Sequence, residues 1–142
     1  MANVVFNAFK MFIGNGSVDW DTDTIHASLH TNSFTPSADN DDHFDDVDNE
    51  VTGAGYTAGG VALASKSVTQ DNTNDRGVYD SNDPSWSTAT IANARYAVLR
   101  KNRGGAASAD ELIGAWDFGA DISSTAATFS IAVNANGWFT VA

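Results

Sequence analysis

Apolar and polar residues alternate along most of this chain, and alternation with a period of two predicts strands. The clearest run covers residues 94–101, where Tyr96 and Val98 share one face. Asn136 and Gly137 form a strong hairpin-turn signal, so the last two runs are expected to pair. The pattern predicts about eight strands, at residues 24–31, 61–69, 76–80, 86–91, 94–101, 111–118, 128–133 and 138–141.

The stretch that organises the rest is residues 53–80, which joins a glycine-rich start, two extended runs and a polar turn. The turn, residues 71–75, is made of Asp, Asn and Thr side chains, which bond back to their own backbone. Glycine is favoured where another backbone approaches closely or where φ is positive. The glycine spacing differs from that of a phosphate-binding loop, and no helical pattern follows. We therefore predict a β-hairpin with a glycine hinge in front of it.

Residues 1–16 form the one segment with helical periodicity, and its apolar positions centre on Phe9 and Phe12. Asn3 is the expected N-cap, and the Gly-Asn-Gly run at 14–16 is the expected end. We expect this helix to pack on the sheet; the alternative is an arm swapped onto a neighbouring subunit. The predicted fold is all-β, an antiparallel β-sandwich or barrel with a short N-terminal helix, in a single domain over residues 1–142.

The charge balance narrows the classes of partner. The chain has 18 acidic and 7 basic residues, a net charge of −11, and such a surface repels nucleic acids and anionic membranes. There is no cysteine, which removes disulfides and thiolate sites. The longest apolar run near the N-terminus, residues 11–13, is far too short for a signal peptide or a membrane span. We expect a protein made in the cytosol, with no nucleic-acid or membrane partner.

Two segments raise the question of a metal site. Asp19, Asp21 and Asp23 alternate, but the calcium-loop template needs Gly and Glu where Thr24 and His30 stand. A solvated turn is the preferred interpretation. His26 and His30 share one side of a predicted strand but lie roughly 13 Å apart at the strand rise. They cannot share a metal, and we expect them at the surface.

Residues 39–50 are the second acidic segment, with seven carboxylates in twelve residues. Phe44 and Val47 lie three apart within it, so a single helical turn would attach the loop to the core. A run of charge is most often a solvated face, which is the interpretation we favour. A metal cluster and an acidic partner-binding face are the alternatives. We assign no metal ligand and no cofactor.

No catalytic motif is recognisable in the chain. Arg76 and Arg95 are expected to form structural ion pairs, with carboxylates such as Asp75 or Asp80, rather than an anion site. The large aromatic residues are expected mainly in the core, as in other small domains. A stacking platform for a carbohydrate is the alternative for the four tryptophans, Trp20, Trp86, Trp116 and Trp138. We assign no catalytic residue.

Several of these turn and strand patterns occur together and in order. They include Asp21-Thr22-Asp23-Thr24-Ile25, Asp45-Asp46-Val47-x-Asn49-Glu50-Val51, Gly53-x-Gly55-Tyr56-Thr57-Ala58-Gly59-Gly60, Ala94-Arg95-Tyr96-Ala97-Val98 and Leu112-Ile113-Gly114-x-x-Asp117-Phe118-Gly119. In this the chain resembles a family of small structural proteins of tailed bacteriophages. The resemblance covers nearly the whole chain. It departs from the family at the loop 102–110, where a tighter turn is usual.

The resemblance implies a non-enzymatic virion protein. Its acidity suits an outer surface, so the leading expectation is a capsid decoration (cement) protein, made in the cytoplasm of the host bacterium. Its expected partners are the major capsid protein and other copies of itself, with a trimer as a plausible assembly. One alternative is a tail or neck component, in which residues 32–53 would form a long mobile hairpin. The other is a surface carbohydrate-binding module.

Overall fold

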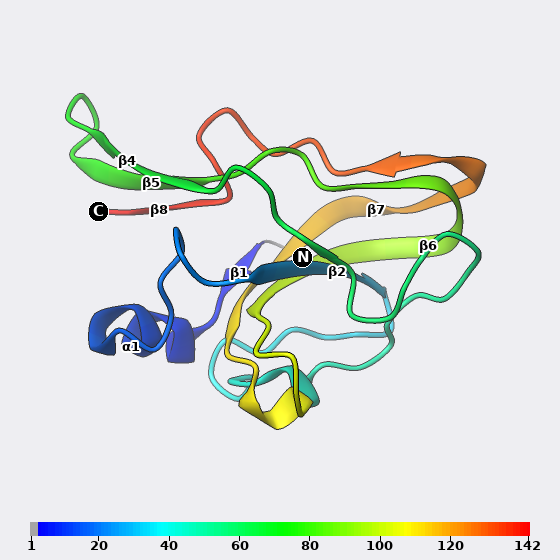
Figure 1. Ribbon diagram of the computed structural model, residues 1–142, viewed down its shortest axis with the longest axis horizontal. Coiled ribbons are helices and arrows are strands. Elements are labelled where there is room, and N and C mark those ends of the chain that lie inside the picture. The colour runs from blue at the N-terminus through cyan, green and yellow to red at the C-terminus, as the bar shows by residue number, and fades with distance from the viewer. Residues whose placement is uncertain (1–2) are drawn as a thin grey trace.

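The structure is a computed structural model that describes residues 3–142, and it contains two antiparallel β-sheets (Figure 1). Within these residues there are eight strands, one α-helix and two single-turn 3-10 helices, so the prediction of an all-β sandwich with a short N-terminal helix is confirmed. The elements are β1 (Val4–Val5), α1 (Asn7–Asn15), β2 (Ile25–Thr31), η1 (Phe44–Asp46), β3 (Val61–Ala62), β4 (Ser67–Asp71), β5 (Arg76–Asp80), β6 (Ser85–Lys101), η2 (Ala107–Ala109), β7 (Leu112–Ser130) and β8 (Phe139–Val141).

The sandwich is built on one long bent hairpin, β6 with β7, whose strands have 17 and 19 residues. One sheet has the order β1-β7-β6-β2-β3 and the other has the order β4-β5-β8. The first half of β6 and the second half of β7 bend away from β2 into the layer of the smaller sheet (Figure 1). Strands that change layer through a bend make the corner of a sandwich.

The sequence divides each of these long strands in two, and that prediction is wrong. It expects separate strands at 86–91 and 94–101 in place of β6, and at 111–118 and 128–133 in place of β7. The structure instead has register shifts at the bend, where Thr88, Asn93 and Ala126 have positive φ. A β-bulge bends a strand without ending it, so turn-like residues inside a long strand imitate a break.

The turn at Asn136 and Gly137 forms as predicted, but it does not join a hairpin. The Gly137 N–H donates to the Asn134 carbonyl at 2.8 Å, and Gly137 has a positive φ of 76°. Beyond the turn, the Trp138 N–H donates to the Tyr79 carbonyl at 2.8 Å and β8 pairs with β5 instead of β7. The predicted pairing of the last two strands is therefore wrong, because contacts with β5 direct the chain into the other sheet.

The helix α1 begins later than the sequence indicates. Val4 and Val5 form β1 and pair with β7, and Phe6 is the N-cap in place of Asn3. β-Branched residues favour an extended backbone when a strand edge is available to them. Phe9 and Phe12 are buried, so the helix packs on its own chain, as expected. Gly16, with a φ of 79°, ends it as expected.

The predicted hairpin and its glycine hinge are both present. β4 and β5 pair around the turn at residues 71–75, while the expected strand 61–69 is divided into β3 and β4. A Cβ on Gly53 would lie 1.8 Å from the Thr90 carbonyl oxygen, and one on Gly60 would lie 1.8 Å from the Ala27 carbonyl oxygen. These glycines let the loop pass directly against the backbones of β6 and β2.

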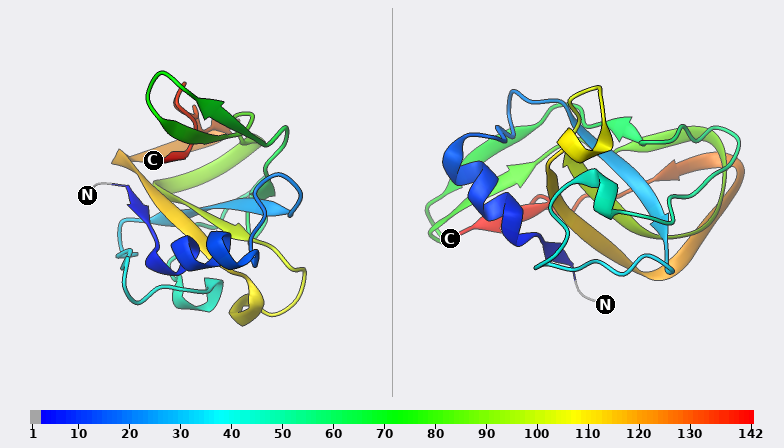
Figure 2. Two further views of the ribbon diagram at one scale, coloured as in Figure 1. Left: turned by 90° about the vertical axis from the view of Figure 1, so that its left-hand side faces the viewer. Right: turned by 90° about the horizontal axis from the view of Figure 1, so that it is seen from below.

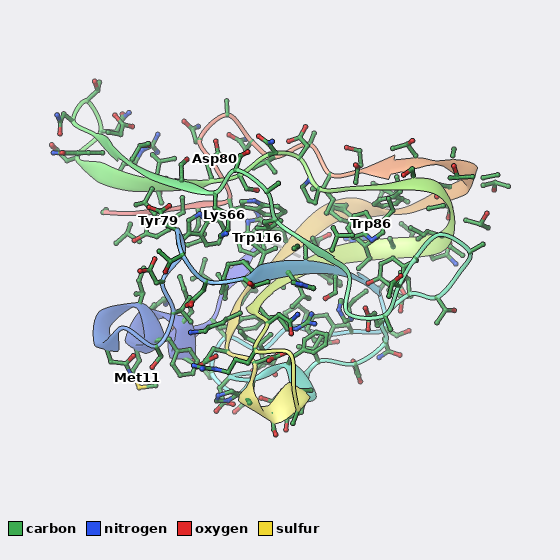
Figure 3. All side chains as sticks on the ribbon, in the orientation of Figure 1. Met11, Lys66, Tyr79, Asp80, Trp86 and Trp116 are labelled. Carbon is green, nitrogen blue, oxygen red and sulfur yellow. The ribbon has the colours of Figure 1, made fainter. Side chains whose placement is uncertain are left out.

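The core has two parts, one between the layers and one on the outer face of the larger sheet. All four tryptophans belong to the first, and none is more than 9% exposed. Figure 3 shows Trp86 and Trp116 between the two layers. The second part is covered by the segment after β2, and its buried residues are Phe6, Phe34, Tyr96, Val98, Leu112 and Ala115.

Candidate functional site

The densest polar chemistry lies on β2, on a face that the sequence places in solvent. Ser28 and His30 are completely buried, and His26 is partly buried. The prediction that both histidines are surface residues is therefore wrong. Phe34 and Phe44 fold back over this face, and their rings lie 5.5 and 6.2 Å from the His30 ring.

Ser28 and His30 form a hydrogen-bonded pair. The Ser28 Oγ lies 2.9 Å from the His30 Nε2, and the His30 Nδ1 lies 2.8 Å from the Asp48 carbonyl oxygen. Because a carbonyl can only accept, Nδ1 carries the proton and the Ser28 hydroxyl donates to Nε2. Burial lowers the pKa of His30, so the ring stays neutral. This geometry is that of a serine nucleophile beside its base. Here, however, both side chains are 0% exposed and their hydrogen bonds are satisfied inside the core.

A second pair closes the outer edge of β2. The Tyr56 hydroxyl donates to Glu50 Oε1 at 2.6 Å and accepts from the Leu29 N–H at 2.9 Å. The Gly59 N–H donates to the same Glu50 oxygen at 2.6 Å. Burial, and then the bond to Glu50, raise the pKa of Tyr56 far above its usual value, which keeps the hydroxyl protonated as a donor. These contacts cover a strand edge that would otherwise offer free backbone groups.

A buried ion pair joins β6 to the loop before β7. The Arg100 Nε donates to Asp110 Oδ2 at 3.1 Å, and the two side chains are 6% and 4% exposed, respectively. The guanidinium also donates to the Gly59 carbonyl at 3.0 Å and lies 3.7 Å from the centroid of the Phe44 ring. The other Asp110 oxygen accepts from the Arg103 N–H at 2.9 Å. Both Asp110 carboxylate oxygens and two of the guanidinium nitrogens thus have partners within the protein.

The acidic loop, residues 39–50, folds against the loop 102–111. The Phe44 N–H donates to the Asp110 carbonyl at 3.0 Å, and the Leu112 N–H donates to the Asp42 carbonyl at 3.0 Å. The expected single turn is η1, and Asp46 accepts from the backbone at its start. Between residues 3 and 142 no three carboxylate or histidine side chains are grouped closely enough to hold a metal ion.

The other sequence candidates also have structural partners. Asp19 accepts from the Asp21 N–H at 3.1 Å in the expected turn, and Asp23 pairs with Lys101 at 2.9 Å. The remaining two are the arginines: Arg76 bonds Asp71 at 2.9 Å and Arg95 bonds Asp117 at 2.5 Å. Both are ion pairs as expected, but with other carboxylates than Asp75 or Asp80, because Asp71 faces Arg76 across the β4–β5 register.

Two adjoining hollows lie along the outer side of β7, and we call them the lateral groove. They measure about 480 and 280 Å³ and share Phe118, Ile131 and Ala132. Trp116 and Phe129 add to the apolar lining, and Ile122 stands at the groove with 42% of its surface exposed. The larger hollow is of mixed character, because Arg76, Asp117 and Asn136 are also in its lining, whereas the smaller one around Ile122 is mainly apolar and open to solvent.

Sequence reasoning missed the buried network around His30 and also missed the groove. A signal for the network is the cluster of apolar residues Phe34, Phe44 and Val47 in the loop that follows β2, which has to fold over something. For the groove no comparable signal exists, because it depends on which edge of β7 remains free.

Comparisons with other proteins add no identification. No family model, no curated protein and no solved structure matches this chain. In the part of the chain that the structure describes, every helix is too short or too polar to cross a bilayer.

Proposed function

We propose that this chain is a non-enzymatic structural protein that decorates the outer surface of a tailed-phage capsid. It would be made in the cytoplasm of the host bacterium and would bind the major capsid protein and other copies of itself. The proposal rests on the resemblance of the sequence and on the way charge is distributed over the fold.

The separation of charge is the observation that carries the proposal. Residues 84–94 and 122–142 contain no charged side chain, although the chain has a net charge of −11. These residues form the bent half of the β6–β7 hairpin and the chain beyond it, in the upper layer of Figure 1, whereas residues 39–50 lie below the lower layer. Contact surfaces are depleted in charge at their centres because charged groups are costly to desolvate. These uncharged segments suit docking, and the acidic loop suits solvent.

The basic side chains strengthen this separation. Five of the seven lysines and arginines are in ion pairs within the chain. Few cations therefore remain to offset the acidic loop, and neighbouring copies repel one another except through the uncharged segments 84–94 and 122–142. A repeated shell protein needs this combination of solubility and directed contact.

The structure gives no particular support to the two alternatives. Residues 32–53, the expected mobile hairpin of a tail component, are a loop packed on β2 and on residues 102–111. The tryptophans, the expected platform of a carbohydrate-binding module, are all buried. We therefore retain the capsid surface as the proposed location.

Quantitative mass spectrometry of purified phage particles tests the proposal. A decoration protein is present in hundreds of copies per particle, in a fixed ratio to the major capsid protein. A particle map should then place it on the outside of the shell. A few copies per particle would indicate a tail or neck component, and absence from the particle would refute the proposal.

A further inference from the structure

We propose that residues 120–125 of β7, together with the lateral groove, form a two-fold interface with a second copy of this chain. This inference deepens the proposed function and rests on it for its biological purpose, since a shell protein acts in many copies.

The first observation is an open strand edge. Along one side β7 pairs with β6 over most of its length. On its other side β1 pairs with Gly114 and Ala115 alone, and among residues 3–142 no strand pairs with β7 beyond that point. In the right panel of Figure 2, β7 follows the rim of the molecule, and β1 and the loop that follows β2 (cyan) lie along its first part. An open edge presents unpaired N–H and C=O groups to any strand that can reach it.

The second observation is that six residues of this edge are suited to pairing. Gly119 and Ala126 have φ values of 80° and 45°, and residues 120–125 between them contain no left-handed residue. Six residues is an ordinary strand length. All of them are exposed except Ser124, which is half-buried. The stretch is therefore extended, accessible and long enough to form a short ladder.

The third observation is the absence of the usual protection against edge pairing. Natural edges are commonly blocked by lysine, proline or an inward-pointing charge. Residues 120–125 contain neither lysine nor proline. Their one charged group, Asp121, accepts from the Asn32 side chain at 3.0 Å and lies 3.9 Å from Arg95. The two bulged ends limit the contact to this stretch but leave its centre open.

These features favour a second copy as the occupant. Two chains of net charge −11 repel each other, so they can meet only where charge is scarce, and residues 122–142 carry none. An antiparallel edge is its own complement, because a two-fold axis places each donor opposite an acceptor. An axis at Ile122 places the two Ile122 residues directly opposite each other, so their side chains meet on one face beside the groove. Their exposed surface, 42% in each copy, is then covered along with the groove lining.

The test measures molar mass by light scattering and sedimentation up to about 100 µM protein. We expect the wild-type chain to form dimers, or larger even assemblies, as concentration rises. Ile122→Lys and Thr125→Lys should each weaken association at least about tenfold. Val68→Lys is the matched control: Val68 has the same 42% exposure and gains the same charge, but it lies on β4. It should associate as the wild type does.

Far-UV circular dichroism and tryptophan fluorescence establish that each variant is folded. Hydrogen exchange on the wild type adds an independent measurement, because amides at 120–125 should become more protected as concentration rises. A wild-type monomer at the highest concentration would overturn the inference, as would equal effects at Ile122 and Val68. If the protein is a monomer in solution but abundant on phage particles, the interface is refuted and the proposed function is not. A dimer that is missing from particles overturns the proposed function alone.

Discussion

The glycine loop before β3 can be tested with two glycines that share a backbone conformation and differ in their surroundings. Gly60 has a φ of 76°, and a Cβ there would lie 1.8 Å from the Ala27 carbonyl oxygen. Gly104 has a φ of 78°, and a Cβ there would meet nothing within 4 Å in the described structure. Alanine at either position pays the same conformational cost. Only Gly60→Ala also forces two backbones apart.

The expected losses follow from these distances. A left-handed alanine costs about 1–2 kcal/mol, which is the whole effect expected for Gly104→Ala. At Gly60 the loop has to move more than an ångström away from β2. Such a shift breaks the hydrogen bond from the Leu63 N–H to the Ile25 carbonyl, now 2.8 Å long, and loosens the pairing of β3 with β2. Each lost bond adds about 1 kcal/mol, so we expect about 3–5 kcal/mol for Gly60→Ala.

Urea unfolding followed by tryptophan fluorescence measures both variants, since all four tryptophans are buried. With a slope of about 2 kcal/mol per M, the midpoint should fall by about 1.5–2.5 M for Gly60→Ala and by about 0.5–1 M for Gly104→Ala. Equal losses at the two positions would refute the close-approach explanation of this loop.

Three further predictions concern the polar groups. Tyr56→Phe leaves the Leu29 N–H without its partner, so the free energy of unfolding measured in urea should fall by about 2–4 kcal/mol. Tyr79→Phe is the control: the Tyr79 hydroxyl has no partner within residues 3–142, so the loss should be less than about 0.5 kcal/mol. Because burial lowers the pKa of His30 in the folded state, its contribution is complete above the unfolded pKa of about 6.5 and is lost as pH falls below it. The urea midpoint should therefore drop from pH 6.5 toward 5, less steeply in His30→Asn, and an unchanged slope would contradict this. For residues 39–50 we expect no change in melting temperature with EDTA, because Asp46 bonds to the loop backbone; a lower temperature would reveal a bound cation.

Some features of this protein depend on residues close together in the chain, and these were predictable. The turn between β4 and β5 forms because the Asp71 side chain accepts from the N–H groups of Thr73 and Asn74 at 3.2 and 3.3 Å. The helix ends at Gly16 because glycine readily adopts the left-handed conformation that terminates a helix, and this requires no contact with distant residues. The fold class follows in the same way, since alternation of period two and short polar turns favour antiparallel strands.

The candidate sites were only partly predictable. The run of acidic residues predicted a loop at 39–50, and the structure has a loop there, which contacts residues 102–111. The buried pair Ser28–His30 was assigned to the wrong environment, because polar side chains alternating on a strand usually face water. Its environment is set by Phe34 and Phe44, which come later in the chain and cover that face.

The sequence by itself determined the strand-rich class, the β4–β5 hairpin, the end of the helix and the uneven distribution of charge. Tertiary structure alone decided that β6 and β7 continue through their bend, that β8 joins β5, and that no strand of residues 3–142 covers the far edge of β7. The physical reason is the range of the interactions. Turns and caps are satisfied within a few residues, whereas strand partners and free edges depend on which distant segments reach a strand first.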